Sequence, residues 1–481
     1  SATAELTKNL GVPVESGQSA LVMGALIVHI LDVVPDEEGL TRNSCSRPRT
    51  GTQMSAPNGS WQNVLGSKLP AALGEEIDEF EAQMQLRKQR KIEEKVFAEL
   101  RLRRGAYGQR YDNGHRYDGI RTQEIPFPRR GLTKGPDTAF DAPGMQRIKI
   151  PFGKMTAEQL EVLADCAEEY SNSVIHITTR QDFQLHFIHI DDTPDLMRRL
   201  ASVQITTREA CGNSVRNVTA CPLSGVCNTE TFDVTPYSKA LAQFLLGHPD
   251  CQDFGRKFKI AFSGCKHEAC GLVNMHDLGF IARVRDGKRG FETYVGGGLG
   301  AVPHQGKLFS EFLPENEILP IAQAICRVFA RLGEKINRNR ARIKFLIARM
   351  GLETFIEEVE KERQILPEDA VWTAFLEDLN AYDEEPLKIA AAMNGAAKAD
   401  GFDEWYRTNI YRQRQSGYVV ATISLPLGDL TSNQMRGLAD IARKYVKDTI
   451  RTTVEQNIIF RWVSESDVSQ LYSQLQALGL N

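Results

Sequence analysis

The residues best suited to chemistry in this sequence are cations placed where strands of the first half should end. They are Arg147, Arg180, Arg216, Lys257 and Lys259. Arg147 alternates with Ile148, and Lys257 and Lys259 alternate with apolar residues, so these cations share strand faces opposite the core. Arginine offers a planar fork and lysine a point charge, so their convergence would bind a small, multiply charged oxyanion. Ordinary charges on a sheet surface are the other interpretation of this pattern.

Cysteines form a second group, because six of the nine fall within 60 residues. The two close pairs are Cys221-x5-Cys227 and Cys265-x4-Cys270. Such spacing is typical of four-thiolate iron–sulfur and zinc sites, and His267 and His276 widen the zinc options. Buried cysteines in a reducing cytosol need no function, so spacing alone leaves a structural role open.

A glycine-rich segment, Gly296-Gly297-Gly298-Leu-Gly, follows a strand-like run. Pro303 comes soon after it, and no helix with an acidic residue about 20 positions later is clear, as a dinucleotide-binding loop requires. The segment is therefore interpreted as a tight turn or a close approach to a bulky ligand. The chain carries no Ser/His/Asp hydrolase signature and no Walker-type loop.

The composition is that of a globular protein with room for about three domains. The 481 residues are 42% hydrophobic and 25% charged, with a formal net charge of -4. This balance argues against nucleic acid or a membrane surface as a general partner. The longest apolar run, Ala20–Val28, is too short to span a bilayer. We expect a cytoplasmic protein.

An internal repeat organises the chain. The segment beginning Pro151-Phe-Gly-Lys-Met-Thr156 recurs 275 residues later as Pro426-Leu-Gly-Asp-Leu-Thr431. Each threonine precedes a helical apolar pattern and is followed three residues later by glutamine, which predicts a capping box. The pattern predicts a strand–helix–strand–strand–helix module used twice, an α+β fold. The expected strands are 146–150, 174–178, 183–190, 418–425, 449–454 and 458–463, and the expected closing helices are 193–201 and 465–477.

The N-terminal region divides into two predicted parts. Residues 1–74 form a poorly ordered extension, of which we expect residues 1–53 to have little structural role. Residues 75–143 form a helix followed by an extended, wrapping segment. Between Arg87 and Arg104 lie eight basic and three acidic residues. This excess indicates a solvated helix face or a dock for an acidic partner protein.

Several motifs, in order, resemble the sirohaem-dependent sulfite and nitrite reductases. They are Ile177-Thr-Thr-Arg180-Gln-Asp-Phe-Gln184, Gly212-Asn-Ser-Val-Arg216-Asn, Gly255-Arg-Lys257-Phe-Lys259, Tyr294-Val-Gly-Gly-Gly-Leu-Gly300, Arg342-Ile-Lys344 and Arg349-Met-Gly-Leu-Glu-Thr-Phe355. The resemblance runs from about residue 95 to 481 and includes the duplication. It implies ferredoxin-like modules at 144–207 and, after a linker, within 385–481, with a sirohaem- and anion-binding α/β domain at 208–384.

The resemblance also implies a six-electron reduction at a sirohaem coupled to a [4Fe–4S] cluster. The catalytic anion pocket would consist of Arg147, Arg216, Lys257 and Lys259. Arg180, Gly296, Gly297, Gly298, Arg342 and Lys344 would contact the sirohaem. The Lys-x-Lys pattern favours sulfite as substrate, with nitrite as the alternative. A ferredoxin or a reductase flavoprotein would donate electrons.

This sequence departs from the family's pattern at the cluster ligands. The family's Cys-x5-Cys and Cys-x3-Cys pairs follow the second module, whereas this chain ends at Asn481. We therefore expect the cluster-binding domain to be absent and the metal ligands to lie beyond residue 481. On this interpretation, Cys221, Cys227, Cys265 and Cys270 are non-ligating relics of duplication; the alternative is a cluster in this half. A non-catalytic tetrapyrrole- or anion-binding module, or a partner of a cluster-bearing chain, is the competing function.

Overall fold

The computed structural model describes residues 70–108, 115–117, 121–124, 144–266, 270–379, 384–393 and 399–481. The chain divides into two units at Leu69, and everything below concerns the second unit, Pro70–Asn481. The expectations for residues 1–53, and for the extension as far as residue 69, lie outside the described residues. No helix within the described ranges is long and apolar enough to cross a membrane.

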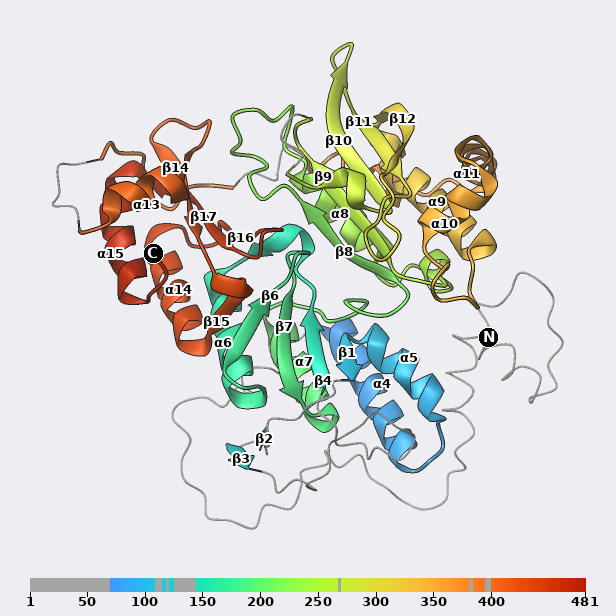
Figure 1. The fold of residues 1–481 in the computed structure, drawn as a ribbon, viewed down its shortest axis with the longest axis horizontal. Helices are drawn as coiled ribbons and strands as arrows, with labels where there is room; N and C mark the ends of the chain where they lie inside the picture. The colour runs from blue at the N-terminus through green and yellow to red at the C-terminus, as the bar shows by residue number, and fades with distance from the viewer. Residues whose placement is uncertain are drawn as a thin grey trace. The chain divides into compact units, whose positions relative to one another are not determined.

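The first module contains the strand–helix–strand–strand–helix order that the repeat predicts (Figure 1). Its elements are β4 (Gly144–Ile148), β5 (Lys154–Met155), α6 (Ala157–Tyr170), β6 (Val174–Ile177), β7 (Phe183–Ile188) and α7 (Thr193–Ser202). The second module repeats them as β14 (Tyr418–Ile423), β15 (Asp429–Thr431), α14 (Ser432–Tyr445), β16 (Ile450–Thr452), β17 (Ile458–Ser464) and α15 (Val468–Ala477). The last predicted helix is thus a 3-10 turn, Glu465–Asp467, followed by α15.

The two modules exchange short strands. β15 of the second module pairs with β6, and β5 of the first module pairs with β16. The resulting sheets have the orders β1-β4-β7-β6-β15 and β13-β14-β17-β16-β5, where β1 is Ala106–Gly108 and β13 is Ile410–Arg412. One continuous apolar core joins both modules. The repeat predicted the modules, but the exchange depends on pairing between residues that lie 253 to 297 positions apart.

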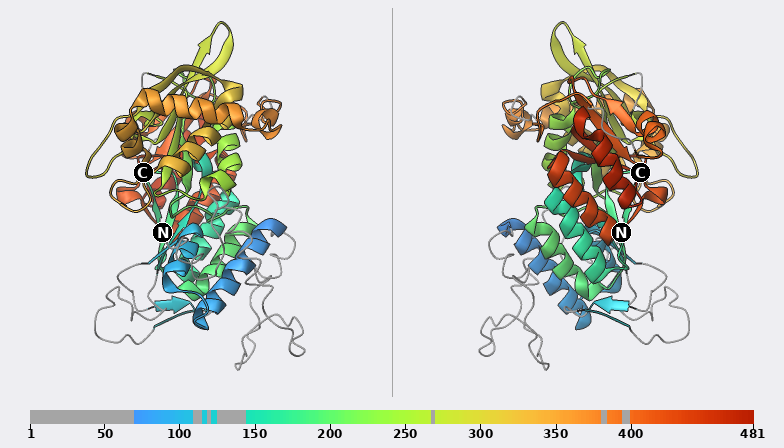
Figure 2. Two further views of the ribbon diagram at one scale, coloured as in Figure 1. Left: turned by 90° about the vertical axis from the view of Figure 1, so that its right-hand side faces the viewer. Right: turned by 90° about the vertical axis from the view of Figure 1, so that its left-hand side faces the viewer.

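Helices α6 and α14 lie side by side against these sheets, as the right-hand view of Figure 2 shows. Arg436 of α14 pairs with Asp165 of α6 at 2.8 Å. Both helices begin with the expected capping box: Thr156 accepts from the backbone of Gln159, and Thr431 accepts from that of Gln434. These caps satisfy amide groups that the first helical turn leaves without partners.

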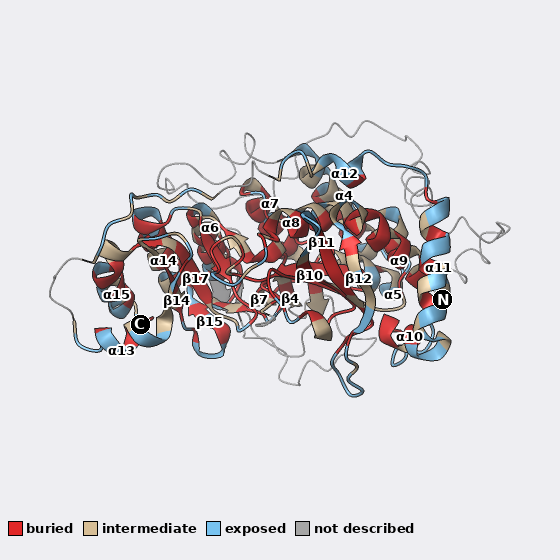
Figure 3. Ribbon diagram, turned by 90° about the horizontal axis from the view of Figure 1, so that it is seen from above, coloured by how far each residue is buried: buried red, intermediate tan, exposed pale blue. Residues whose placement is uncertain are grey.

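The central domain is a five-stranded sheet covered by helices. Its order is β12-β11-β10-β9-β8, with bounds Lys307–Pro314, Lys288–Val295, Leu278–Arg285, Phe258–Ser263 and Val215–Ala220. Helices α8 (Thr235–Leu245), α9 (Ile318–Leu332), α10 (Ile343–Met350), α11 (Leu352–Ile365) and α12 (Val371–Ala374) accompany it. Strands β8 and β9, most of β10 and β11, and the adjoining face of α9 are buried, whereas edge strand β12 is largely exposed and α11 exposes its outer face (Figure 3). Because β8, β9 and β10 are parallel, the segments preceding β8 and β9 lie at one edge.

The single helix expected from residue 75 is two helices, α4 (Ala71–Lys88) and α5 (Glu94–Arg103). The break coincides with Arg90, whose φ is 60°. Arg87 pairs with Glu94, and Arg104 pairs with Glu76, both at 2.7 Å. Much of the basic excess therefore stabilises contacts within the chain. The wrapping segment contributes β1, β2 (His115–Tyr117) and β3 (Thr122–Glu124), and the rest of it lies outside the described residues.

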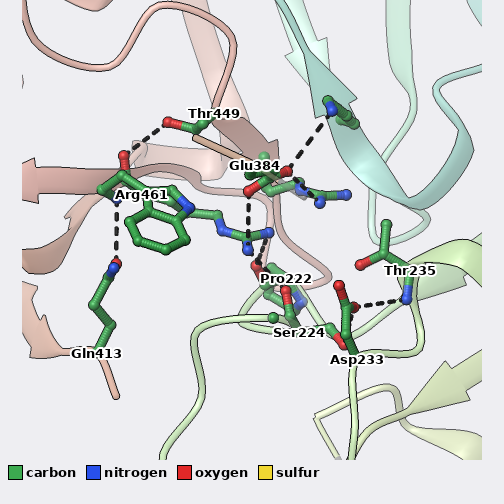
Figure 4. A network of polar contacts seen from close by, with 12 residues as sticks. Pro222, Ser224, Asp233, Thr235, Glu384, Gln413, Thr449 and Arg461 are labelled. Atoms are coloured by element: carbon green, nitrogen blue, oxygen red, sulfur yellow. Dashed lines mark hydrogen bonds and ion pairs between the residues drawn. The ribbon is translucent and has the colours of Figure 1, made fainter. Parts of the chain in front are cut away.

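A buried ion-pair network joins the second module to the central domain (Figure 4). Glu384 accepts from Arg451 at 2.7 Å and pairs with Arg461 at 3.0 Å. Arg461 also donates to the carbonyl oxygen of Ser224 at 2.8 Å. Residues 221–228, here called the 221–228 loop, thus lie against β17, and Val226 of this loop packs on Val420 and Ile459.

Candidate functional site

The pairing of β8 with β9 brings three of the predicted anion ligands together. Val215 lies opposite Phe258, so Arg216 is next to the segment that carries Lys257 and Lys259. Phe258 and Ile260 point into the core, which turns the two lysines to the other face. The Arg216 guanidinium donates to the carbonyl oxygens of Gly212 at 3.1 Å and Ala210 at 3.0 Å. Its orientation is therefore fixed by the backbone.

Lys257 and Lys259 are partly buried cations. Burial, followed by repulsion from Arg216, Arg342, Arg256 and Arg147, lowers the pKa of Lys257 to about 8. Burial likewise lowers the pKa of Lys259 to about 7, with added repulsion from Arg180 and Lys257. Neither ammonium group has a hydrogen bond or ion pair with the described part of the chain. Asp277 offsets part of the repulsion at Lys259, but cations outnumber the carboxylates here, and such an excess of positive charge favours an anion.

Arg147 enters the cluster from β4 of the first module. Its guanidinium lies over the Tyr107 ring, 5.4 Å from the centroid. The side-chain amide oxygen of Gln184, on the neighbouring strand β7, accepts from Nε of Arg147 at 3.0 Å. Below them lies Asp182, 2% exposed, whose pKa burial raises to about 6 although Arg147 and Arg180 oppose this rise. The buried carboxyl group of Asp182 thus lies close to the guanidinium groups of Arg147 and Arg180.

Arg180 is buried beneath the cluster and has three partners in the chain. Its guanidinium donates to the carbonyl oxygens of Ile260, at 3.1 Å, and Asn217. Its Nη1 lies 2.7 Å from Nε2 of His276. Burial, followed by repulsion from Arg180, lowers the pKa of His276 well below its ordinary value. His276 is therefore neutral: Nδ1 donates to the Leu272 carbonyl oxygen at 2.7 Å, and Nε2 accepts from Arg180.

Arg342 and Lys344 hold the glycine-rich segment. Nζ of Lys344 donates to the carbonyl oxygens of Gly298, at 3.3 Å, and Leu299, at 3.0 Å. A Cβ atom on Gly297 would lie 2.6 Å from the carbonyl oxygens of Asn274 and His276. A Cβ atom on Gly298 would lie 2.8 Å from Nη2 of Arg342, and Gly296 has a φ of 77°. These close approaches to the protein agree with the tight-turn interpretation, and contact of Gly296, Gly297 and Gly298 with a bulky ligand stays a prediction.

The sequence interpretation missed several residues that organise the site. Asp277 pairs with Arg342 at 2.7 Å, and its Oδ2 accepts from the backbone N–H of Lys259 at 2.8 Å. His176, on the outer face of β6, lies 2.8 Å from Asp429 of the second module. His186 stands on the same face of the sheet, its ring centroid 6.4 Å from that of His176. Alternation within β6 and β7 could have placed both histidines with Gln184.

The four cysteines of the alternative metal site do not form a ligand set. Within the described ranges, no three His, Cys, Asp or Glu side chains are grouped so that they could hold a metal ion. The thiols of Cys221 and Cys270 form a hydrogen bond. The Cys227 thiol lies 3.3 Å from Oγ1 of Thr229 and accepts from the Tyr411 hydroxyl at 3.7 Å. Cys221 therefore contacts Cys270, but these thiols do not form a group of three or more ligands within the described ranges.

Comparison with known proteins agrees with this architecture. The family model described as "Nitrite and sulphite reductase 4Fe-4S domain" matches residues 211–365. The model described as "Nitrite/Sulfite reductase ferredoxin-like half domain" matches residues 143–203 and 411–478. These matches coincide with the central domain and the two modules, and together they cover more than half of the chain.

Individual relatives give the same result. The chain is 29% identical over 344 residues to a chloroplastic ferredoxin–nitrite reductase of Arabidopsis thaliana, which covers 69% of this chain and 54% of that protein. It is 27% identical over 343 residues to sulfite reductase [ferredoxin] 1 of Mycolicibacterium paratuberculosis, covering 70% and 56%. The chain thus spans about half the length of these relatives.

A solved structure supports the fold over a larger part of the chain. The Mycobacterium tuberculosis NirA protein aligns with a TM-score of 0.63 at 25% identity, covering 81% of this chain and 64% of that one. Both modules and the central domain thus have counterparts in known proteins, in the order found here. The chain therefore belongs to the nitrite and sulphite reductase family.

Proposed function

We propose that this chain forms the substrate-binding part of a sirohaem-dependent reductase that converts sulfite to sulfide. The observation that carries the proposal is that the partly buried ammonium groups of Lys257 and Lys259, beside Arg216 and Arg147, have no hydrogen-bond or ion-pair partner among the described residues. A dianion such as sulfite would replace their missing partners. Water satisfies such cations poorly once they are partly buried, so the site favours a multiply charged ligand.

The same residues suit the proton demand of the reaction. Reduction of an oxyanion to a hydride product removes each oxygen as water and therefore consumes protons. Lys259, with a pKa of about 7, can hold a proton at Nζ and release it near neutral pH. Asp182, with a pKa of about 6, lies behind Arg147 and can exchange protons in the same range. The arginines remain charged and orient the anion.

The described residues fit a polycarboxylated tetrapyrrole. Arg256 and Arg338 flank the cluster, and neither has a hydrogen bond or ion pair with the described chain. These two arginines and Arg342 would bind carboxylates of the sirohaem. Arg180, which is buried beneath the cluster, would add positive charge near these carboxylates. Sirohaem, when bound, supplies an iron centre that binds the anion and passes electrons to it. The thiols in the described ranges do not fit the [4Fe–4S] cluster that the family implies.

A comparison of the outer sheet faces of the two repeated modules supports the first module as the one that binds the cofactor. The outer sheet face of the second module is covered by the 221–228 loop, with Val226 on Ile459. An offset of 275 residues makes Gln184 and His186 the equivalents of Ile459 and Arg461. Gln184 and His186 are only half-buried, whereas Ile459 and Arg461 are buried. The polar face of the first module therefore has the open surface that a large anionic ligand needs.

Nitrite is the alternative substrate, because the relatives include nitrite reductases as well as sulfite reductases. The Lys257-x-Lys259 pair favours sulfite, since two ammonium groups match a dianion better than a monoanion. Ferredoxin is the proposed electron donor, as the names of the relatives indicate, and a reductase flavoprotein is the alternative. A non-catalytic anion- or tetrapyrrole-binding module is the remaining alternative.

The proposal is tested by purifying residues 1–481 from cells that overproduce sirohaem. We expect absorption bands of a bound tetrapyrrole in the wild type and their loss in the Arg216→Ala, Arg342→Ala double variant. With a chemical reductant, sulfite consumption above nitrite consumption supports the sulfite assignment, and the reverse supports nitrite. Bound sirohaem without turnover of either anion supports the non-catalytic module. Absence of sirohaem from a folded protein contradicts the proposal.

A further inference from the structure

The reductase chemistry leaves the cysteines of the central domain without a role. Cys221 lies directly after β8. Cys270 lies seven residues after the end of β9, the strand that pairs with β8. The backbone N–H of Cys221 donates to the carbonyl oxygen of Phe262 at 3.1 Å, so the two strand ends are joined at this point. The two thiols form a hydrogen bond. The two sulfur atoms are thus in contact although 48 residues separate them in the sequence.

The two thiols differ in accessibility. Cys221 is 5% exposed, whereas Cys270 is half-buried. The hydrogen bond from Cys270 and burial raise the pKa of Cys221 well above its ordinary value, so this residue rests as a thiol. A solvent-borne oxidant therefore meets Cys270 first and finds Cys221 beside it. This arrangement of an accessible thiol with a resolving neighbour is typical of an oxidisable pair.

We propose that Cys221 and Cys270 form a dithiol that a peroxide oxidises to an intramolecular disulfide. Peroxide first oxidises the Cys270 sulfur to a sulfenic acid and releases one water. The Cys221 sulfur then attacks that sulfur, the S–O bond breaks, and the hydroxyl leaves with a proton as a second water. Two electrons pass from the sulfurs to the peroxide, and both thiol protons end in water.

The disulfide would affect the contact between the 221–228 loop and the second module. Cys221 begins the 221–228 loop, whose Val226 packs on Val420 and whose Ser224 accepts from Arg461. A covalent link to Cys270 would restrain the start of this loop relative to the segment after β9. We therefore expect the oxidised protein to have a higher Tm than the reduced protein, because the link restricts the unfolded chain. The inference does not depend on which anion the site binds.

The chain provides a matched control for the oxidation. Cys251 and Cys326 also form a thiol–thiol hydrogen bond, but both side chains are 0% exposed. If contact alone sufficed, both pairs would oxidise. If access through Cys270 is required, only the Cys221–Cys270 pair will react.

The experiment uses the reduced full chain and hydrogen peroxide as the probe. After treatment, free thiols are alkylated under denaturing conditions and peptides are mapped by mass spectrometry without reduction. We expect a Cys221–Cys270 cross-linked peptide, with Cys251 and Cys326 still alkylated. Cys270→Ser should abolish both the cross-link and the rise in Tm, and Cys251→Ser should change neither. Because Cys270 is half-buried, its variant is the one less prone to misfolding.

Three results would overturn the inference. One is that both thiols are alkylated after peroxide treatment; another is that the buried Cys251–Cys326 pair oxidises equally. The third is stoichiometric iron or zinc in the purified protein that is lost in Cys221→Ser and Cys270→Ser, which would make the cysteines metal ligands. Failure of sirohaem binding would contradict the proposed function but leave the cross-linking result unaffected.

Discussion

Arg342 holds the carboxylate of Asp277 through Nε at 3.0 Å and Nη2 at 2.7 Å. The same carboxylate accepts from the backbone N–H of Lys259 at 2.8 Å. Asp277 is 0% exposed and immediately precedes β10. This single residue therefore joins the strand that carries the anion-binding lysines to the arginine beside the glycine-rich segment.

The first prediction concerns this pair. Asp277→Asn should lower the free energy of unfolding by about 3 kcal/mol, because it leaves a largely buried guanidinium without its countercharge. Urea denaturation of the two proteins measures the difference. The control is Glu358→Gln, which removes a carboxylate paired with the exposed Arg331 and Lys361 and should lower the free energy of unfolding far less. Equal losses in both variants would contradict the structural role of Asp277.

The second prediction is a loss of anion affinity as pH rises. The pKa values of Lys259 and Lys257 are about 7 and about 8. Both are bases, so they are cations below these values and neutral above them. Sulfate, whose charge is constant between pH 6 and 9, should therefore bind roughly tenfold more weakly at pH 9 than at pH 6. Calorimetric titration measures this change. Lys259→Met should remove the transition near pH 7, and an affinity independent of pH in the wild type would contradict the prediction.

The third prediction concerns Glu384, which joins Arg451 and Arg461. Burial would raise its pKa, but Arg451, Arg461 and Lys154 hold it at about 2. The folded-state pKa lies below the ordinary value of 4.5, so the carboxylate stabilises the fold at neutral pH. This stabilisation is lost as pH falls from about 4.5 to about 2.

Glu384→Gln should therefore cost about 3 kcal/mol at pH 7 and progressively less in acid. Unfolding free energies measured at several pH values provide the test. Glu455→Gln, at an exposed position, is the control and should change little. A cost that does not vary between pH 7 and pH 3 would show that the ion pairs are not its source.

The fourth prediction compares the two capping boxes. Thr156→Ala and Thr431→Ala should each lower the free energy of unfolding by about 1 kcal/mol, because each leaves an amide group of the first helical turn without its acceptor. Serine at either position should restore most of the loss. Chemical denaturation measures all four variants, and a loss in only one module would contradict their equivalence.

Much of the fold could be predicted from the sequence because the repeat carries local signals twice. Thr156 and Thr431 marked helix starts, and alternation located β6, β7, β16 and β17 to within a few residues. The reciprocal pairing of β5 and β15 could not be predicted, because two- and three-residue strands have almost no pattern of their own. The break at Arg90 was also missed, because helix-favouring residues continue through it.

The candidate site was predicted in outline. Arg147, Arg216, Lys257 and Lys259 were identified by their type and alternation, and the structure brings them together. Their partners were not identified, because Asp277 and Gln184 are distant in sequence and carry no motif. For Arg180 the structure adds partners that the motif did not indicate, His276 and backbone carbonyl groups, and its contact with a sirohaem stays a prediction.

The central claim, that the basic cluster is the anion site of a nitrite and sulphite reductase, is tested most directly by sulfite calorimetry at pH 6.5. The proteins compared are the wild type, the Lys257→Met, Lys259→Met double variant and the surface control Lys307→Met, all with retained thermal stability. The account predicts that the double variant binds sulfite at least about 100-fold more weakly than the wild type, while the control binds equally well. Equal sulfite affinity in all three proteins would contradict it.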